Sequence, residues 1–181
     1  MRLISLYILA MFVLSSTVQA REEFWYLGVG GGTTFLEDDD AFTSIDEKSD
    51  TLKAYVGYRA STYVAFELEY AYLGEYNYSQ GPLEEKAEYS TVGLAIVVMY
   101  PLVWEDLDLY TPIGISGVAA DYGVDDEIVS GYKLGFGVAY TPTKHFTMRV
   151  GGEVVFFDLD VIDETYRQQL SSVYATIQFN F

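Results

Sequence analysis

Apolar residues occupy every second position in several separate stretches of this chain. The clearest stretch is residues 172–181, where five apolar residues alternate with five polar ones. A period of two predicts a β-strand with one apolar and one polar face. The same pattern recurs along the chain and predicts eight strands, at about residues 24–36, 51–59, 63–73, 88–100, 107–120, 129–141, 145–157 and 169–181.

The connections between these strands alternate in length. Short connectors follow the second, fourth and sixth strands, whereas acidic stretches follow the others, at Glu37–Asp50, Glu75–Glu88, Asp121–Glu127 and Asp158–Glu164. Short turns that alternate with long loops are typical of membrane-spanning barrels. Closure into a barrel also removes the aggregation-prone edge that an aromatic terminal strand would otherwise expose. The sequence therefore predicts an all-β fold, an eight-stranded antiparallel up-and-down transmembrane β-barrel.

The two faces of the predicted strands differ in side-chain size. The apolar face is rich in Val, Leu, Ile and aromatic residues, and the opposite face carries many Gly, Ala and Ser residues. A water-facing surface would be mostly charged, whereas a crowded barrel interior needs small residues. We therefore expect the apolar face to contact lipid and the small, polar face to line the lumen.

Aromatic residues gather near the two ends of the strands, as expected for girdles at the two membrane interfaces. The alternative is the ordinary enrichment of aromatic residues in strands. The first predicted girdle, near the short connectors and the termini, contains Phe24, Trp25, Tyr58, Tyr63, Tyr100, Trp104, Tyr140, Phe146, Phe179 and Phe181. The second, near the acidic stretches, contains Phe35, Tyr70, Tyr72, Tyr89, Tyr132 and Phe156.

The N-terminal residues 1–20 have the form of a secretory signal peptide. Arg2 precedes an apolar run, and small residues precede the expected cleavage after Ala20. The remaining residues, 21–181, suit a single barrel domain. The chain contains no cysteine, so disulfides do not contribute to the fold. A net charge of −17 argues against nucleic acid as a partner.

With its signal peptide, its first strand FWYLGVGGG, its seventh strand FTMRVGGE and its terminal Phe181, the chain resembles the OmpA-like and OmpX-like family of small bacterial outer-membrane barrels. The resemblance implies an outer-membrane location, a monomer, and the lipid bilayer and lipopolysaccharide as surroundings. It also implies that Phe179 and Phe181 form the signal read by the outer-membrane assembly machinery. The fold itself hosts many unrelated functions.

Seven ionisable residues fall on the predicted lumen face: Lys53, Arg59, Glu67, Glu69, Lys133, Arg149 and Glu153. Charges in a narrow barrel must pair or meet water. They could form an ion path or gate, but a salt-bridged plug is favoured because an eight-stranded interior is only just wide enough for side chains. Three-residue turns would place Lys53 opposite Glu69 and Lys133 opposite Glu153, with Arg149 able to reach Glu67 or Glu153.

Two further groups of residues have side chains suited to chemistry. His145, Thr147 and Glu153 resemble the His, Ser and Glu set of barrel lipid A deacylases, but the threonine and the position of His145 beside a short turn argue against catalysis. The acidic clusters Asp38, Asp39, Asp40 and Asp125, Asp126, Glu127 could bind surface Ca²⁺ or Mg²⁺, although charge runs are commonly just solvated. We expect no catalytic residues and no cofactor.

These observations favour a non-enzymatic outer-membrane barrel with a structural or surface-interaction role, in envelope integrity, adhesion or stress resistance. The alternative is a narrow small-solute channel. A lipid A-modifying enzyme is the least favoured of the three.

Overall fold

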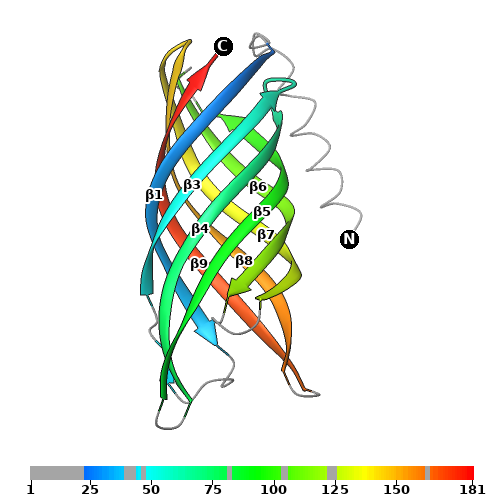
Figure 1. Cartoon of the computed structure of the whole chain (residues 1–181). Helices are drawn as coiled ribbons and strands as arrows, with labels where there is room; N and C mark the ends of the chain where they lie inside the picture. The colour runs from blue at the N-terminus through cyan, green and yellow to red at the C-terminus, as the bar shows by residue number, and fades with distance from the viewer. Residues whose placement is uncertain are drawn as a thin grey trace, which may run out of the picture.

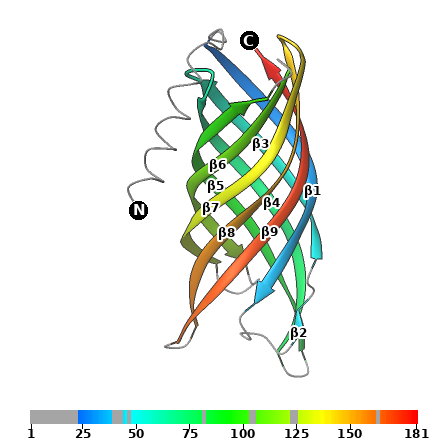
Figure 2. The ribbon, with the colours of Figure 1, turned by 180° about the vertical axis from the view of Figure 1, so that it is seen from behind.

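The computed structural model describes residues 23–38, 44–45, 48–80, 83–102, 106–121, 126–161 and 164–181; the expected signal peptide lies outside these ranges. The described residues form a closed antiparallel barrel of eight strands, as predicted (Figures 1 and 2). The barrel strands are β1 Phe24–Asp38, β3 Lys48–Arg59, β4 Val64–Gln80, β5 Leu83–Pro101, β6 Leu107–Asp121, β7 Asp126–Thr143, β8 Phe146–Val161 and β9 Glu164–Asn180. A short strand, β2 Ser44–Ile45, pairs with the outer part of β4.

Strand order around the barrel follows the chain, apart from the closing seam between β1 and β9. Pairing runs β4-β3-β1-β9-β8-β7-β6-β5 and returns from β5 to β4. At the seam, Trp25 and Phe181 exchange two backbone hydrogen bonds, with N···O distances of 3.1 and 2.9 Å. Phe181 is therefore part of the hydrogen bonding that closes the sheet. No described helix is long and apolar enough to cross a membrane.

Alternate residues of each strand point to the outside and to the inside of the barrel. The apolar side chains point outward: Tyr132 is 73% exposed and Phe179 57%. The intervening residues are enclosed, so that Thr176 and Asn180 of β9 are 3% and 2% exposed. The predicted assignment of the apolar face to the outside of the barrel is confirmed.

We call the end of the barrel with the short connectors the turn end and the opposite end the hairpin end. The strands reach further toward the hairpin end than predicted: β4–β5 pairing continues to Gln80 and Leu83, and β8–β9 pairing continues to Val161 and Glu164. Much of two acidic stretches predicted as loops is therefore strand. The β4–β5 extension contributes Tyr76 and Ala87 to an inward apolar cluster at this end, which gives it a core to bury. The cluster contains Leu36, Ala71, Leu73, Tyr76, Ala87, Tyr89, Val118, Ala120, Val155, Phe157 and Leu170.

Large inward tyrosines fill the rest of the barrel because glycines on neighbouring strands make room for them. A Cβ added to Gly57 would lie 2.3 Å from the ring of Tyr26, its partner in the β1–β3 register. A Cβ at Gly28 would meet the ring of Tyr55 at 2.1 Å in the same way. Gly28 and Gly57 are thus the counterparts of bulky aromatic residues, and so are Gly137 and Gly151, which lie against Tyr110.

Among the girdle residues that the structure describes, two point inward instead; Trp104 lies outside the described residues. Phe24 packs 6.1 Å from the ring of Tyr26, and Tyr89 is fully buried in the hairpin-end cluster. Each lies two residues before an inward-facing residue of the same strand, Phe24 before Tyr26 and Tyr89 before Thr91, and therefore faces inward as well. The girdle assignment is wrong for them because residues at the same height along the barrel can lie on either face of the sheet.

Candidate functional site

The charged interior of the barrel is the candidate functional site. All seven predicted lumen residues lie inside, each 7% exposed or less, together with Asp108, which the sequence analysis missed. Four are cations and four are anions: Lys53, Arg59, Lys133 and Arg149, and Glu67, Glu69, Asp108 and Glu153. They come from β3, β4, β6, β7 and β8. The set is formally neutral, so the buried charges of the described lumen residues balance.

Two lysines and two glutamates form a quartet at mid-height. Lys53 Nζ lies 2.6 Å from Glu153 Oε2 and 3.1 Å from Glu69 Oε2. Lys133 contacts Glu69 directly and has its Nζ 3.9 Å from Glu153 Oε2. The Nζ of Lys53 also lies 4.4 Å from the centre of the Tyr174 ring, which adds a cation–π contact. Each lysine ammonium therefore forms ion pairs with both glutamate carboxylates.

Arg149 forms the next layer toward the turn end. Its Nη1 donates to Glu67 Oε1 at 2.6 Å, and the Tyr26 hydroxyl donates to the same oxygen at 2.7 Å. The guanidinium lies 5.1–5.2 Å from the ring centres of Tyr26, Tyr55 and Tyr110. The ion pair is thereby held in an aromatic cage that excludes water from one side of the charge.

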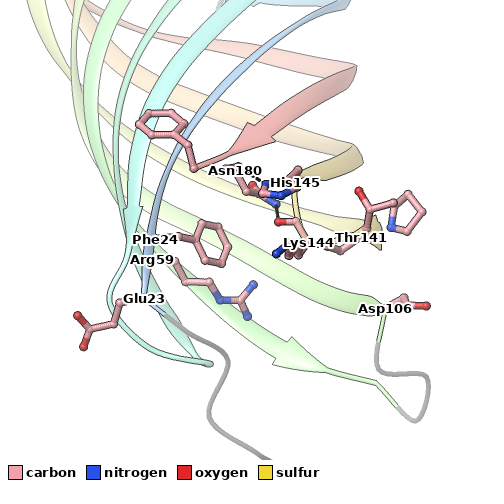
Figure 3. A pocket seen from close by; sticks show the side chains of 11 residues that line it. Glu23, Phe24, Arg59, Asp106, Thr141, Lys144, His145 and Asn180 are labelled. Atoms are coloured by element: carbon pink, nitrogen blue, oxygen red, sulfur yellow. Dashed lines mark hydrogen bonds between the residues drawn. The ribbon is translucent and has the colours of Figure 1, made fainter.

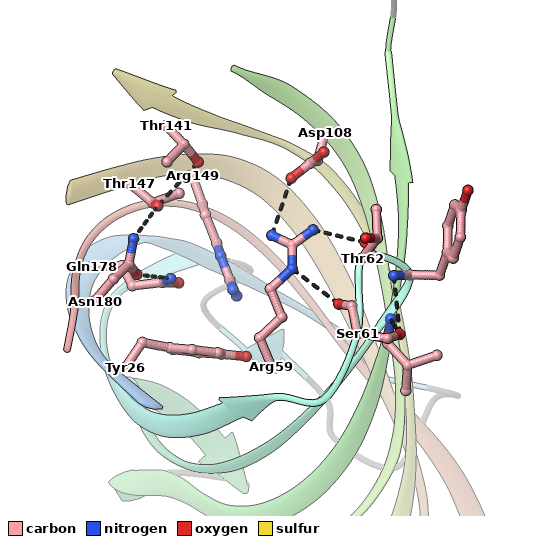
Figure 4. Close-up of polar contacts among 12 residues, drawn as sticks. Tyr26, Arg59, Ser61, Thr62, Asp108, Thr141, Thr147, Arg149, Gln178 and Asn180 are labelled. Atoms are coloured by element: carbon pink, nitrogen blue, oxygen red, sulfur yellow. Dashed lines mark hydrogen bonds and ion pairs between the residues drawn. The ribbon is translucent and has the colours of Figure 1, made fainter. Parts of the chain in front are cut away.

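Arg59 occupies the turn end of the lumen. It donates to Asp108 Oδ2 at 3.3 Å, to the Ser61 carbonyl at 3.1 Å and to the Thr62 carbonyl at 2.7 Å (Figure 4). A chain of polar contacts faces it across the lumen, from Thr141 through Thr147 and Asn180 to Gln178 (Figure 4). Asp108 lies two residues before the inward-facing Tyr110 on the same strand, and this spacing could have identified it as an inward-facing anion.

Apolar packing encloses the charged layers. A cluster of Tyr26, Tyr55, Ala65, Val97, Met99, Tyr110 and Ala139 surrounds the Arg149 layer. Along β4, the inward residues after Glu69 are Ala71 and Leu73, both 1% exposed and both in the hairpin-end cluster. The lumen thus becomes more apolar from the quartet toward the hairpin end, where the uncharged polar residues Thr34, Gln168 and Ser172 are also buried.

The predicted register is wrong by two residues at both short turns. Lys53 pairs across the sheet with Ala71 rather than Glu69, and Lys133 with Val155 rather than Glu153. At the first turn, the Ser61 hydroxyl accepts from the Tyr63 and Val64 amides, which extends the turn. A shift of two keeps every side chain on its own face, so the lysines still reach Glu69 and Glu153 diagonally.

At the second turn, Thr143 pairs with Phe146, and a bulge follows between Thr143 and Tyr140. Pro142 lies in this bulge and lacks an amide hydrogen, so it cannot continue the ladder. The tight turn and the bulge together produce the observed register.

An open cavity of about 560 Å³ lies at the turn end, lined by residues that include Phe24, Arg59, Lys144 and His145 (Figure 3). The His145 ring stacks on Phe179 at 6.2 Å, and its Nδ1 is 3.3 Å from the Asn180 carbonyl oxygen. Thr147 instead contacts Thr141, while Glu153 pairs with Lys53. The structure does not join His145, Thr147 and Glu153 by any described hydrogen bond.

The side chains of the candidate metal ligands lie outside the described residues. Asp38 and Asp126 lie at strand ends, but the side chains of Asp38, Asp39, Asp40, Asp125, Asp126 and Glu127 are outside the described part of the structure. Among the described residues, no group of three or more His, Asp or Glu side chains is arranged to hold a metal ion.

The chain matches the family described as the OmpA-like transmembrane domain over residues 20–179. It is also 31% identical over 112 residues to outer membrane protein A of Serratia marcescens, a match covering 56% of this chain and 31% of that protein. The chain therefore corresponds to about a third of that relative.

Solved barrels share the fold at low sequence identity. Neisserial surface protein A has a TM-score of 0.63 at 14% identity, covering 91% of this chain and 100% of its own. Ail of Yersinia pestis, solved with the heparin analogue sucrose octasulfate, has a TM-score of 0.60 at 13% identity, covering 89% and 100%. OprG of Pseudomonas aeruginosa has a TM-score of 0.55 at 12% identity, covering 88% and 95%. The chain belongs to the OmpA-like transmembrane domain family and is a β-barrel of the bacterial outer membrane.

Proposed function

We propose that this protein is a sealed, non-enzymatic outer-membrane barrel that acts through its surface, in adhesion, envelope integrity or stress resistance. One observation carries the proposal. Among the described residues, the lumen holds four buried cations and four buried anions that pair with one another, and an apolar cluster fills its hairpin end.

A channel would need a hydrated path that an ion could follow. Here an entering ion would have to displace Lys53 or Lys133 from carboxylates that already neutralise them, and would then meet buried apolar side chains. Breaking a buried ion pair without replacing the lost partner costs about 3–5 kcal/mol. The paired charges and the apolar cluster favour the sealed barrel over the small-solute channel.

The hairpin end supports a role in surface contact. The four acidic stretches, extended to Arg167, hold 19 of the 27 acidic residues but only three basic ones, Lys48, Lys86 and Arg167. In the layout of the family this end faces the cell exterior, where it can contact lipopolysaccharide phosphates through bridging Ca²⁺ or Mg²⁺. The polyanion in the Ail complex is a poor fit to so acidic a surface.

The proposed role also includes a monomeric barrel whose Phe179 and Phe181 are read by the assembly machinery. The two rings stack at 6.3 Å on the outer face, and both are more than half exposed. Exposure on the lipid side leaves these rings accessible to a partner during insertion.

Planar-bilayer recordings test the proposal directly. The purified barrel should give no step-like conductance above the lipid background, and a stable open pore would establish the channel alternative. Lipid A from cells with and without the protein should have the same mass profile; a loss or gain of an acyl chain would establish an enzyme.

A further inference from the structure

An apolar furrow crosses the outer face of the barrel from the turn end toward the hairpin end. It has a volume of about 800 Å³ and is lined by residues of β1, β3, β4, β5, β6 and β7. Trp25 marks one end, next to the first residue of β1, and Tyr132 marks the other, in the half of β7 nearer the hairpin end. Neighbouring strands are about 4.8 Å apart, so the five spacings from β1 to β7 make the furrow about 24 Å long.

The strand register produces this furrow. Its floor is the backbone of one row of register partners whose side chains are absent or point into the lumen: Gly57, Glu67, Ala95 and Gly114. The residues before and after each of these point outward and form two apolar walls. The wall nearer the turn end consists of Trp25, Tyr58, Phe66, Ile96 and Ile113. The other wall consists of Val56, Leu68, Leu94, Ile115 and Tyr132. Hydrogen-bonded ladders hold both walls in place, so little backbone order is lost on binding.

A second, smaller furrow of about 410 Å³ runs beside the first. Its floor is the adjacent inward row of register partners, Gly93, Ser116 and Gly131. The residues that line both furrows form a common wall of Leu68, Leu94, Ile115 and Tyr132. The two floors lie two residues apart on each strand, about 6.8 Å at 3.4 Å per residue. Two hydrocarbon chains can therefore lie side by side, one in each furrow.

The position of the furrows limits the occupant to a membrane lipid. The chain is an outer-membrane barrel, and the furrows lie on its exposed apolar face. The hydrocarbon core of a bilayer is about 30 Å thick, so one leaflet is about 15 Å deep. The longer furrow exceeds this depth and accommodates the full length of a tilted acyl chain. Two adjacent furrows match the two acyl chains of a phospholipid.

The rim at the turn end selects the headgroup. Trp25 and Tyr58 have ring centres 5.1 Å apart and belong to the girdle, where aromatic side chains lie at the level of the headgroups. The Tyr58 hydroxyl donates to Glu23 Oε2 at 2.6 Å, which holds an exposed carboxylate at the mouth of the longer furrow. No Lys or Arg is among the described residues that line either furrow. The rim therefore favours an ammonium group over a headgroup with a net negative charge.

We propose that the two furrows hold the acyl chains of one phospholipid of the phosphatidylethanolamine class, with its ammonium group beside Glu23. The hairpin end faces the cell exterior in the layout of the family, so this lipid belongs to the periplasmic leaflet. The site lies on the outer wall and depends neither on the sealed lumen nor on the acidic hairpin end.

The test counts the lipids that stay bound to the folded barrel. The barrel is reconstituted in bilayers of equal amounts of phosphatidylethanolamine and phosphatidylglycerol, extracted in a mild detergent and analysed by native mass spectrometry. We expect one retained phospholipid per barrel, with phosphatidylethanolamine preferred by about two- to fivefold, the effect of one exposed charge pair. Glu23→Gln should abolish this preference and keep the total of retained lipid.

Photochemical labelling locates the acyl chains. Phosphatidylethanolamine with a diazirine in one acyl chain should label the furrow residues of β4, β5 and β6. Leu94→Trp places a bulky ring in the wall common to both furrows, and the retained lipid should be lost. Leu52→Trp is the matched control, because this leucine is similarly exposed, 66% against 59%, and lines neither furrow. Heat-modifiable migration shows that both variants fold.

Labelling spread evenly around the barrel, equal loss of lipid in Leu94→Trp and Leu52→Trp, or no retained phospholipid would each reduce the furrows to ordinary bilayer contacts and overturn the inference. Equal retention of the two lipids would overturn the assignment of the headgroup to Glu23. The conductance test of the sealed lumen is unaffected by any of these results, so the two proposals fail separately.

Discussion

Arg149 and Glu67 meet across the barrel interior at 2.6 Å, although they belong to β8 and β4, which are not neighbours in the sheet. The pair therefore links two parts of the wall that no backbone ladder joins. Glu67→Gln should destabilise the barrel by about 3–5 kcal/mol, because it leaves a buried guanidinium without its counter-ion. Guanidinium chloride unfolding in micelles measures the loss.

The double variant Glu67→Gln with Arg149→Met provides the control for this prediction. Removing both charges should recover much of the stability lost in Glu67→Gln alone, since no unpaired charge remains. Additive losses in the double variant would show that the two side chains are not energetically coupled.

The lysine quartet predicts a second phenotype, leakage. Neutralising Glu69 and Glu153 together should leave Lys53 and Lys133 buried without counter-ions, so that stability falls and water or anions enter the lumen. Glu69→Gln alone should be worse than Glu153→Gln, because Glu69 contacts both lysines closely, whereas Glu153 lies 3.9 Å from Lys133. Chloride flux from liposomes should increase in the order wild type, Glu153→Gln, Glu69→Gln, double variant. Unchanged flux in the double variant would contradict this account.

The sequence predicted which residues share the lumen but not how they pair. The alternating pattern alone places Lys53, Glu69 and Glu153 on one face, because a register shift by an even number of residues leaves every side chain on the same face of the sheet. The pairing partners depend on turn geometry, and the Ser61 hydrogen bonds and the Pro142 bulge have no signal in a pattern of apolar and polar residues.

The inward tyrosines were missed for a related reason. The inner face was identified by its small residues, yet Gly57 is small because Tyr26 lies against it from the next strand. That relation can be recognised only once the register is known. The extension of β4 and β5 into an acidic stretch was missed likewise, because the apolar inward residues Tyr76 and Ala87 alternate with charged ones there.

Assembly provides a test of the proposed role of Phe181. Deleting this residue removes both backbone hydrogen bonds to Trp25 and the exposed ring beside Phe179. Folded barrel in the outer membrane should decrease, as measured by heat-modifiable migration on unboiled gels. Phe181→Ala keeps the two backbone hydrogen bonds to Trp25 and removes the ring. If this variant also lowers the amount of folded barrel, the effect comes from recognition of the ring by the assembly machinery. Normal folded levels after deletion would argue against both roles.

Divalent cations should order the hairpin end. The acidic residues there repel one another, and the repulsion weakens as salt shortens the Debye length from about 30 Å at 0.01 M to about 10 Å at 0.1 M. Added Ca²⁺ or Mg²⁺ should slow amide exchange in Asp38–Asp40 and Asp125–Glu127 more than sodium at equal ionic strength. An identical response to sodium would indicate screening without specific binding.

The fit between Gly57 and Tyr26 gives the most local prediction. Gly57→Ala places a methyl group where the ring now lies, 2.3 Å from its Cζ, so the tyrosine must move away from Glu67, to which its hydroxyl donates. We expect a loss of about 1–3 kcal/mol, the usual cost of overpacking.

Gly117→Ala is the matched control, because its new Cβ would have its nearest neighbour at 3.9 Å. That variant should lie within about 0.5 kcal/mol of wild type, as is usual for substitutions away from the core. Tyr26→Phe separates the two parts of the Gly57 effect: it keeps the ring and removes the hydrogen bond to Glu67. If Gly57→Ala costs no more than Tyr26→Phe, the damage comes from the lost hydrogen bond, and the steric argument for the inner glycines is wrong.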